Sequence, residues 1–226
     1  MSVPDFQLLE TMRWDGGAAP LERGIFNLDR HLERLAVSAA AFGFIYDEAS
    51  VRAALDATTD GLPDTPHRLR LLLSADGAVG VEAAPLDPGD RMRRAVLHPA
   101  PVAAGGPFWR HKTTHRPHYE GPYRQARAAG FDEAILLDRD GRVVEGTRTT
   151  VWVERDGRLL TPPLAAGGLP GVMRAHLLAH HPAAAEASLT QADLLGADAV
   201  YLSNAVRGLF RVEVHAPGAY RGAARS

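Results

Sequence analysis

Lysine occurs only once in this sequence. Of the 25 basic residues, 24 are arginine and one, Lys112, is lysine. Most solvated positions accept either residue, but an amine that must lose its proton and condense with a carbonyl cannot be replaced by a guanidinium, which stays protonated and is a poor nucleophile. Lys112 is therefore a candidate Schiff-base lysine. The simpler interpretation is a GC-rich genome, whose codon bias turns lysines into arginines and can leave one lysine with no special role.

The segment GGLPGVMRAHLL at 167–178 has the features of an anion site. Its glycines and proline precede a predicted helix, and Pro170 suits the first helical turn. The amides of Val172 and Met173 would then point outward at the positive end of the helix dipole, where a phosphate binds readily. A loop-to-helix junction without a ligand has the same features. The segment is not a Walker loop, and the sequence contains no GxGxxG motif.

Two charged side chains have types that suit such a site. Arg34 lies in LDRHLERL beside the apolar positions of a predicted helix, where its guanidinium could clamp a phosphate or carboxylate through two N–H groups. Glu145 ends an apolar strand in RVVEGTRTT, and a carboxylate in a dry crevice can keep a heteroaromatic nitrogen protonated, as an electron-sink cofactor requires. The simpler interpretations are a solvated charge at the helix flank and an edge-strand glutamate that faces water.

Asn204 and Arg207, in YLSNAVRGL, follow a predicted strand. Their N–H donors suit a substrate carboxylate, and the same residues could equally form a turn. The ten histidines form no HxxxH pattern with an acidic partner, so we expect no metal site. The chain has no cysteine, which excludes a disulfide framework, a cysteine-ligated zinc site and a thiol nucleophile.

The composition is that of a globular chain, with 226 residues of which 46% are hydrophobic and 23% charged. It excludes a disordered protein. The 25 basic and 27 acidic residues are interspersed and give a net charge of −2, so we expect a small-molecule ligand and neither a nucleic acid nor a membrane as partner. Neither a signal peptide nor an apolar run of about 18 residues is present, which leads us to expect a cytoplasmic protein.

Apolar periodicity places the elements of the first half. The clearest is a helix in LDRHLERLAVSAAAF, which Asn27 or Asp29 could cap and near whose end lies Gly43. The other expected elements are a strand over 6–14, a helix over 47–58, a hairpin of strands over 67–74 and 79–85, and a strand over 95–98.

The second half is richer in strands. Asp-Gly pairs separate apolar segments over 133–138, 142–154 and 158–162, which favours an antiparallel meander. Further expected elements are helices over 119–129, 170–180 and 190–195 and closing strands over 198–203 and 208–214. We predict an α/β (α+β) fold of two domains, the second of which contains a curled or barrel-like sheet.

Several motifs together resemble those of the class IV (fold type IV) pyridoxal-phosphate enzymes. They are EGTRTT, TPPLAAGGLPGVMR, LDRHLERLAVSAAAFGF and the lone lysine in FWRHKTTHRPHYE, and the resemblance extends from residue 6 to about residue 210. LLETMRW, HKTTHRPHYE and NAVRGLFR resemble most closely the aminodeoxychorismate lyase branch, which serves folate biosynthesis. The segment PAPVAAGGP over 99–107 is the nearest thing to a linker, so we expect a small domain over 1–98 and a larger domain over 108–226, which by the resemblance would bind the cofactor.

The resemblance also implies a role for each candidate residue. Lys112 would bind pyridoxal 5′-phosphate covalently and carry the proton, and Glu145 would face the pyridine nitrogen. Leu169 would pack against the ring. The phosphate would be held by Arg34, Val172 and Met173, and the substrate by Asn204 and Arg207. A homodimer is expected because relatives bind the cofactor near a dimer interface.

The sequence departs from the family pattern in three places. Ala205 stands where relatives often carry a hydroxyl that binds the phosphate, and the chain starts later than free-standing relatives. Tyr119 follows the lysine at a wider spacing than the tyrosine of the aminotransferases. Branched-chain and D-amino-acid aminotransferases share the same scaffold, so an aminotransferase for these substrates is one alternative to the lyase. Ala205 and the later start motivate a second, a binding protein with a decayed site.

Overall fold

The computed structural model describes residues 5–16, 24–87, 89 and 92–221. Contacts within the chain divide it into two compact units. The first unit is Met1–Asp90 with His111–His115, and the second is Arg91–Arg110 with Arg116–Ser226. The chain thus leaves the first unit, returns to it for one short segment that contains the single lysine, and ends in the second.

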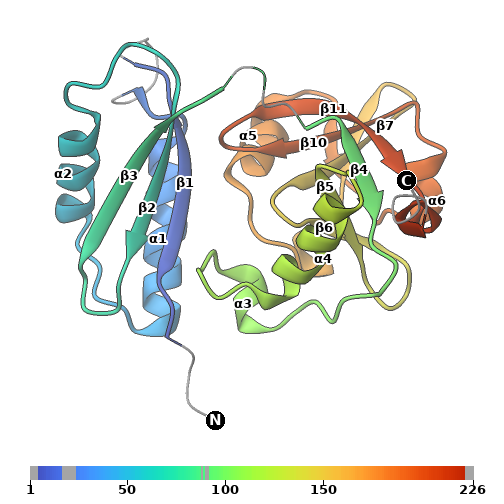
Figure 1. The fold of residues 1–226 in the computed structure, drawn as a ribbon, viewed down its shortest axis with the longest axis horizontal. Coiled ribbons are helices and arrows are strands. Elements are labelled where there is room, and N and C mark those ends of the chain that lie inside the picture. The colour runs from blue at the N-terminus through green and yellow to red at the C-terminus, as the bar shows by residue number, and fades with distance from the viewer. Residues whose placement is uncertain (1–4, 17–23, 88, 90–91, 222–226) are drawn as a thin grey trace. The chain divides into compact units, whose positions relative to one another are not determined.

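The first unit consists of a three-stranded antiparallel sheet, in the order β1-β2-β3, and two helices (Figure 1). Helix α1 packs against β1, and α2 packs against β3. The bounds confirm the sequence prediction to within two residues at each end. The elements are β1 (Leu8–Trp14), α1 (Leu28–Phe42), α2 (Glu48–Thr59), β2 (His67–Leu73) and β3 (Val79–Pro85).

Helix α1 forms because its apolar positions recur at helical spacing and can all be buried on one side. Gly43 ends the helix in the left-handed conformation, with φ of 71°, and donates its N–H to the Ala39 carbonyl. The start of the helix differs from the prediction, because Asn27 occupies the N-cap position but its side chain makes no capping hydrogen bond. The buried apolar positions are Leu28, Leu32, Leu35 and Ala39.

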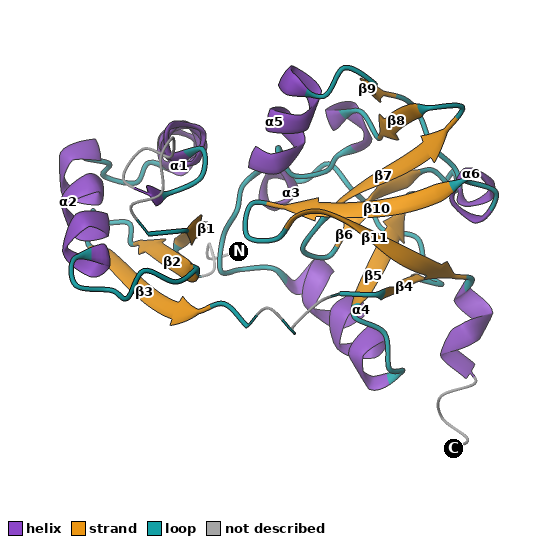
Figure 2. Cartoon of the chain, turned by 90° about the horizontal axis from the view of Figure 1, so that it is seen from above, coloured by secondary structure: helices purple, strands orange, loops and turns teal. Residues whose placement is uncertain are grey.

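The second unit contains an eight-stranded mixed sheet in the order β6-β5-β4-β11-β10-β7-β8-β9. Strands β4 and β5 run at a steep angle to β7 and β10, so the sheet is curled (Figure 2). The predicted mixed α/β class with a curled second sheet is confirmed. The elements are β4 (Arg94–Leu97), α3 (Pro107–Arg110), α4 (Pro117–Ala128), β5 (Glu133–Leu137), β6 (Val143–Gly146), β7 (Thr150–Arg155), β8 (Arg158–Thr161), α5 (Val172–His180), β9 (Ala184–Glu186), α6 (Gln191–Leu195), β10 (Ala199–Asn204) and β11 (Gly208–His215).

The predicted antiparallel meander is wrong in its middle. The segment expected as one strand over 142–154 is divided into β6 and β7, which are neighbours in the chain but lie five places apart in the sheet order. Strand β4 also pairs in parallel with both β5 and β11. Short elements that carry little periodicity, α3 and β9, were not expected. Local turn signals indicate where strands end but not which strands become neighbours.

The boundary between the units also differs from the expected linker at 99–107. Strand β4 was expected to close the first domain, but it pairs with β5 and β11 and so belongs to the second unit. Its residues are buried on both faces of the sheet, Val96 against Phe131 on one side and Leu97 within the larger core on the other. In the sequence, a strand buried on both faces is a short apolar run, and such a run does not indicate which domain's sheet the strand joins.

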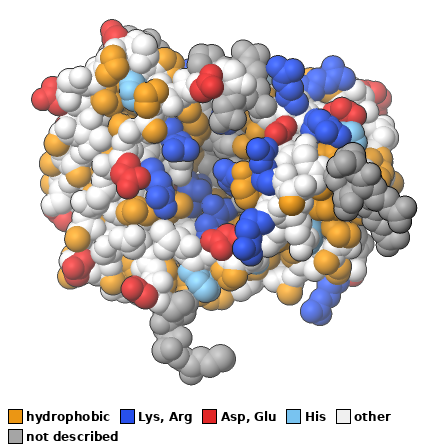
Figure 3. All heavy atoms as spheres, viewed as in Figure 1, with side chains coloured by type: hydrophobic (Ala, Val, Ile, Leu, Met, Phe, Trp, Pro, Cys, Tyr) orange, Lys and Arg blue, Asp and Glu red, His pale blue; other side chains and the backbone are white. Residues whose placement is uncertain are grey.

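Charged side chains of both signs lie close together on the face shown in Figure 3. Within the described ranges, none of the helices is both long enough and apolar enough to cross a bilayer.

Candidate active site

The backbone of Lys112 is paired with the edge of strand β1. The Leu9 N–H donates to the Lys112 carbonyl, and the Thr114 N–H donates to the Gln7 carbonyl, both at 2.9 Å. The residues between these bonds form an antiparallel bridge. The Lys112 side chain is half-buried. Main-chain pairing with a sheet edge therefore fixes the position of the single lysine in the first unit.

Arg34 belongs to a buried cluster of charged groups on α1 and β1. Its Nε and Nη2 atoms donate to the two carboxylate oxygens of Glu10, at 2.8 and 2.6 Å. His31 Nδ1 lies 2.6 Å from Glu10 Oε2. Glu10 is 2% exposed and His31 is fully buried. The simple interpretation of Arg34 as a solvated flank charge is thus wrong, because a two-pronged ion pair with Glu10 sets the plane of its guanidinium.

Electrostatics assign a charge to each member of this cluster. Burial raises the pKa of Glu10, but the positive charge of Arg34 and the hydrogen bonds from His31 and Arg34 outweigh it and bring that pKa down to about 2. Burial lowers the pKa of His31, and the positive charges of Arg34 and Lys112 lower it further, against the effect of Glu10. At neutral pH Glu10 is therefore an anion and His31 a neutral donor to it.

Glu10 and His31 are residues that sequence reasoning missed. One signal for Glu10 was present, since it falls between Leu8 and Met12 on the buried face of an alternating strand. A carboxylate at such a position needs a buried cation. His31 lies one helical turn before Arg34, and that spacing places both side chains on the same side of α1.

Glu145 in the second unit is also buried. It lies on β6, which is an edge strand, but its side chain is only 7% exposed, so the interpretation as a water-facing glutamate is wrong. The Tyr119 hydroxyl on α4 donates to Oε1, and the Leu169 N–H donates to Oε2 at 3.1 Å. A Cβ added at Gly168 would lie 3.4 Å from this carboxylate. That distance is ordinary van der Waals contact, whereas a Cβ at Gly167, whose φ is +99°, would clash with the Ala104 Cβ at 2.6 Å.

The turn after Glu145 is built around a second buried carboxylate, Glu133. Its oxygens accept from the Thr147 N–H at 3.0 Å and from the Thr147 hydroxyl, from the Arg148 N–H at 3.0 Å and from the Thr149 hydroxyl at 3.1 Å. Burial raises the pKa of Glu133, against the effect of these donors. This network explains the first two threonines of EGTRTT, Thr147 and Thr149, which hold the end of β6 in place.

Gly146 has no room for a side chain in this turn. A Cβ there would clash with Thr149 Oγ1 and lie 3.2 Å from Glu133 Cδ. We expect Gly146→Ala to lower the free energy of unfolding by about 1–3 kcal/mol, the usual cost of overpacking. Urea unfolding followed by circular dichroism measures it. Gly121→Ala in α4 is the matched control, because its added Cβ meets nothing within 4 Å and should be neutral or stabilising. Equal stability of both variants would contradict the prediction.

Helix α5 presents its N-terminus without a side-chain cap. Val172 and Met173 are its first two residues, after Gly171 at the N-cap. Their amides have no carbonyl within the helix to bond, which is the arrangement that a phosphate requires. Pro170 precedes the N-cap, so its predicted place in the first helical turn is wrong. A Cβ added at Gly171 would lie 2.9 Å from Thr150 Oγ1, which explains a glycine there.

Asn204 and Arg207 lie at the turn between β10 and β11. The Asn204 side-chain oxygen accepts from the N–H groups of Val206 and Arg207, at 3.1 and 2.9 Å. The turn interpretation is therefore confirmed for Asn204. A substrate contact by either residue stays a prediction. The groups that would donate to the substrate are the Asn204 amide nitrogen and the Arg207 guanidinium. Ala205 lies in the same turn.

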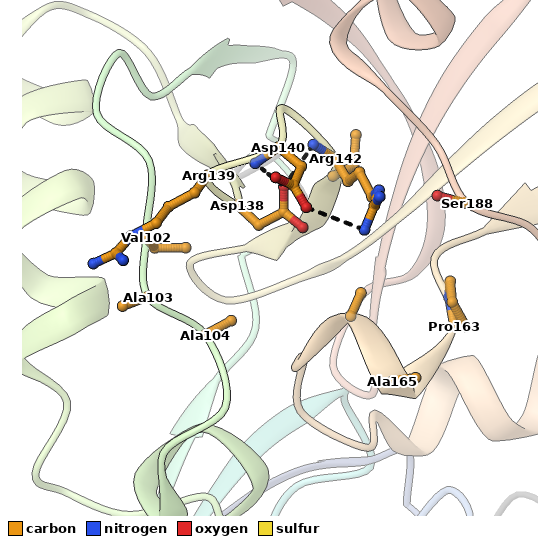
Figure 4. Close-up of a pocket in the computed structure, with 12 residues that line it drawn as sticks. Val102, Ala103, Ala104, Asp138, Arg139, Asp140, Arg142, Pro163, Ala165 and Ser188 are labelled. Carbon is orange, nitrogen blue, oxygen red and sulfur yellow. Dashed lines mark hydrogen bonds and ion pairs between the residues drawn. The ribbon is translucent and has the colours of Figure 1, made fainter.

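A surface cavity of about 510 Å³ opens elsewhere in the second unit. Figure 4 shows the ion pair between Asp140 and Arg142 on the turn between β5 and β6, and Pro163 and Ala165 across from it. None of the predicted site residues lines this cavity. The residues that line the cavity are Val102, Ala103, Ala104, Asp138, Arg139, Asp140, Arg142, Val143, Pro163, Ala165, Ala166 and Ser188.

Among the described residues, no group of three or more His, Asp or Glu side chains is arranged so that it could hold a metal ion.

Comparison with known proteins covers nearly the whole chain. The family model described as "Amino-transferase class IV" matches residues 7–214. The structure of a "Putative amino-acid aminotransferase" from Mesorhizobium loti superposes with a TM-score of 0.85 and 36% identity, over 93% of this chain and 100% of that one.

Two curated relatives have different names. A "Putative aminodeoxychorismate lyase" from Schizosaccharomyces pombe is 29% identical over 185 residues, which are 78% of this chain and 74% of that protein. A "Putative branched-chain-amino-acid aminotransferase" from Methanocaldococcus jannaschii is 48% identical over 50 residues, 22% of this chain and only 17% of the relative. The relatives therefore agree on the scaffold and differ in the activity for which they are named.

Proposed function

This chain belongs to the class IV aminotransferase family, and from that membership we propose that it is a lyase that converts 4-amino-4-deoxychorismate to 4-aminobenzoate and pyruvate, with pyridoxal 5′-phosphate as its cofactor. The observation that carries the lyase assignment is the S. pombe match, which is 29% identical and spans 78% of the chain. The M. loti structure, 36% identical over 93% of the chain, is named as an aminotransferase and supports the alternative. The motifs LLETMRW, HKTTHRPHYE and NAVRGLFR support the same branch.

The described residues fit this cofactor. Its aldehyde needs a primary amine, and Lys112 is the only lysine side chain of the sequence. Its ring nitrogen needs a buried carboxylate, and Glu145 is one. Its phosphate needs backbone amides and a guanidinium, which Val172, Met173 and Arg34 would supply. Leu169 would pack against the ring with its side chain, while its N–H holds Glu145.

When bound, pyridoxal phosphate supplies a sink for the electrons of a carbanion. The Lys112 amine would hold the cofactor and would remove the proton from the amine-bearing carbon of the substrate ring. The adjacent C–O bond then breaks and the enolpyruvyl group leaves as pyruvate, after taking up a proton. The ring becomes aromatic, which makes the elimination strongly downhill. Asn204 and Arg207 would bind the substrate carboxylate.

A direct assay tests this proposal. The purified protein is incubated with enzymatically generated 4-amino-4-deoxychorismate, aminobenzoate is followed by its fluorescence, and pyruvate is followed with lactate dehydrogenase. We expect the two products in equal amounts. A parallel assay offers branched-chain and D-amino acids with a keto-acid acceptor and measures the new keto acid. Formation of a keto acid without aminobenzoate would contradict the lyase proposal and support the aminotransferase alternative, the activity for which the M. loti and M. jannaschii relatives are named.

A decayed site would fail at an earlier step. A protein that only binds its ligand would show no visible cofactor band, and borohydride would leave no pyridoxyl mass on Lys112. We expect a yellow protein whose band borohydride removes, with the added mass on the peptide that contains Lys112.

A further inference from the structure

Each oxygen of the Glu145 carboxylate receives one hydrogen bond from the second unit. The Tyr119 hydroxyl donates to Oε1, and the Leu169 N–H donates to Oε2. A carboxylate has about four acceptor positions, and these donors occupy one on each oxygen. The backbone donor is fixed by the loop before α5. Tyr119 is thus a side chain through which the chain can adjust Glu145.

The Tyr119 ring is held on several sides. It is 6% exposed and packs with Trp109, whose ring centroid lies 5.1 Å away, and with Leu136 and Val144. The Arg116 guanidinium carbon lies 4.7 Å from the ring centroid, and Arg116 Nη2 donates to the Thr147 carbonyl at 2.6 Å. The start of α4 is thereby tied to the turn that follows Glu145. The phenol oxygen consequently has little freedom to leave the carboxylate.

The hydroxyl keeps its proton across the neutral pH range. Burial raises the pKa of Tyr119, and the negative charge of Glu145 and the hydrogen bond to it raise that pKa further. The phenol is therefore always the donor and the carboxylate the acceptor. A donor of this kind stabilises the ionised form of a carboxylate.

We propose that Tyr119 is a positioning residue for Glu145, whose hydroxyl keeps that carboxylate oriented and ionised so that it can retain a proton on the cofactor's ring nitrogen. This inference rests on the proposed cofactor site. Without the hydroxyl, Glu145 loses a protein donor and takes up a proton more readily, which withdraws the proton from the ring nitrogen and weakens the electron sink.

The test uses Tyr119→Phe in the holoenzyme. We expect the pH midpoint of the visible cofactor band to rise by about one unit, cofactor affinity to fall several-fold and turnover to fall about ten-fold, since a shift of one pKa unit corresponds to a ten-fold change in equilibrium. Tyr123→Phe is the matched control, because it lies on the same helix but its ring contacts Arg148, at 3.5 Å from the guanidinium carbon. It should match the wild type in all three measurements. A merely structural role would leave the midpoint of Tyr119→Phe unchanged, and this result would overturn the inference.

A double variant shows whether the effect passes through Glu145. Adding Tyr119→Phe to Glu145→Gln should shift the midpoint no further, because the carboxylate is already gone. An additional shift would overturn the inference. If the single Tyr119→Phe variant does not fold, the comparison of Glu145→Gln with the double variant can still be made, because neither protein contains a buried carboxylate that has lost its tyrosine donor. Wild-type protein that forms no band with pyridoxal phosphate would instead contradict the proposed function.

Discussion

Lys112→Ala should lower turnover by about a thousand-fold, the middle of the range for loss of a general acid–base group. No other lysine can take its place, because the sequence contains none. The variant should also lack the borohydride-sensitive band. Visible spectra, peptide mass spectrometry and the aminobenzoate assay measure these losses.

Lys112→Arg is the matched variant for this experiment. It keeps the positive charge but cannot condense with an aldehyde, because a guanidinium stays protonated. We expect it to be as inactive as Lys112→Ala. Activity near the wild-type level in either variant would show that the reaction does not pass through this amine.

Glu10→Ala should lower the free energy of unfolding by about 3–5 kcal/mol, as expected when one partner of a buried ion pair is removed. The change removes the two carboxylate oxygens that accept from Arg34, one of which also lies 2.6 Å from His31 Nδ1. Urea unfolding at pH 7 measures the loss. Glu48→Ala is the matched control, because Glu48 pairs with Arg52 on the exposed side of α2 and should cost less than about 1 kcal/mol. Equal losses in the two variants would contradict a structural role for the buried cluster.

The pH dependence of stability provides a second measurement of Glu10. Its pKa is about 2 in the fold and about 4.5 ordinarily, so the unfolded chain binds the extra proton between these values. The stabilisation is complete above about pH 4.5 and is lost as the pH falls towards 2. Between about pH 6 and about pH 3, the free energy of unfolding should fall less steeply with decreasing pH in Glu10→Ala than in the wild type. If the free energy of unfolding had the same pH slope in both proteins, the acid sensitivity would arise from groups other than Glu10.

The local elements of this protein were largely predictable. The apolar stripe of α1, the hairpin of β2 and β3 and the Asp-Gly turns all depend on residues close together in the chain. Several candidate site residues could also be identified by type and motif, with Lys112 standing out because it is the single lysine of the sequence. Their burial was not predictable. Glu145 lies on an edge strand and is covered by α4 and by the loop before α5, which are distant in the sequence.

Sequence alone determined which chemical groups are available, because one amine among 24 guanidiniums and the EGT and LPGVM segments are properties of residue type and local order. Tertiary structure decided what surrounds those groups. The placement of β4 in the second unit, the pairing of 111–115 with β1 and the partners Glu10 and Tyr119 all arise from contacts between residues far apart in the chain. The physical reason is that side-chain periodicity reports which face of a strand or helix is buried, whereas strand neighbours and buried ion pairs depend on the free energy of the whole packed unit.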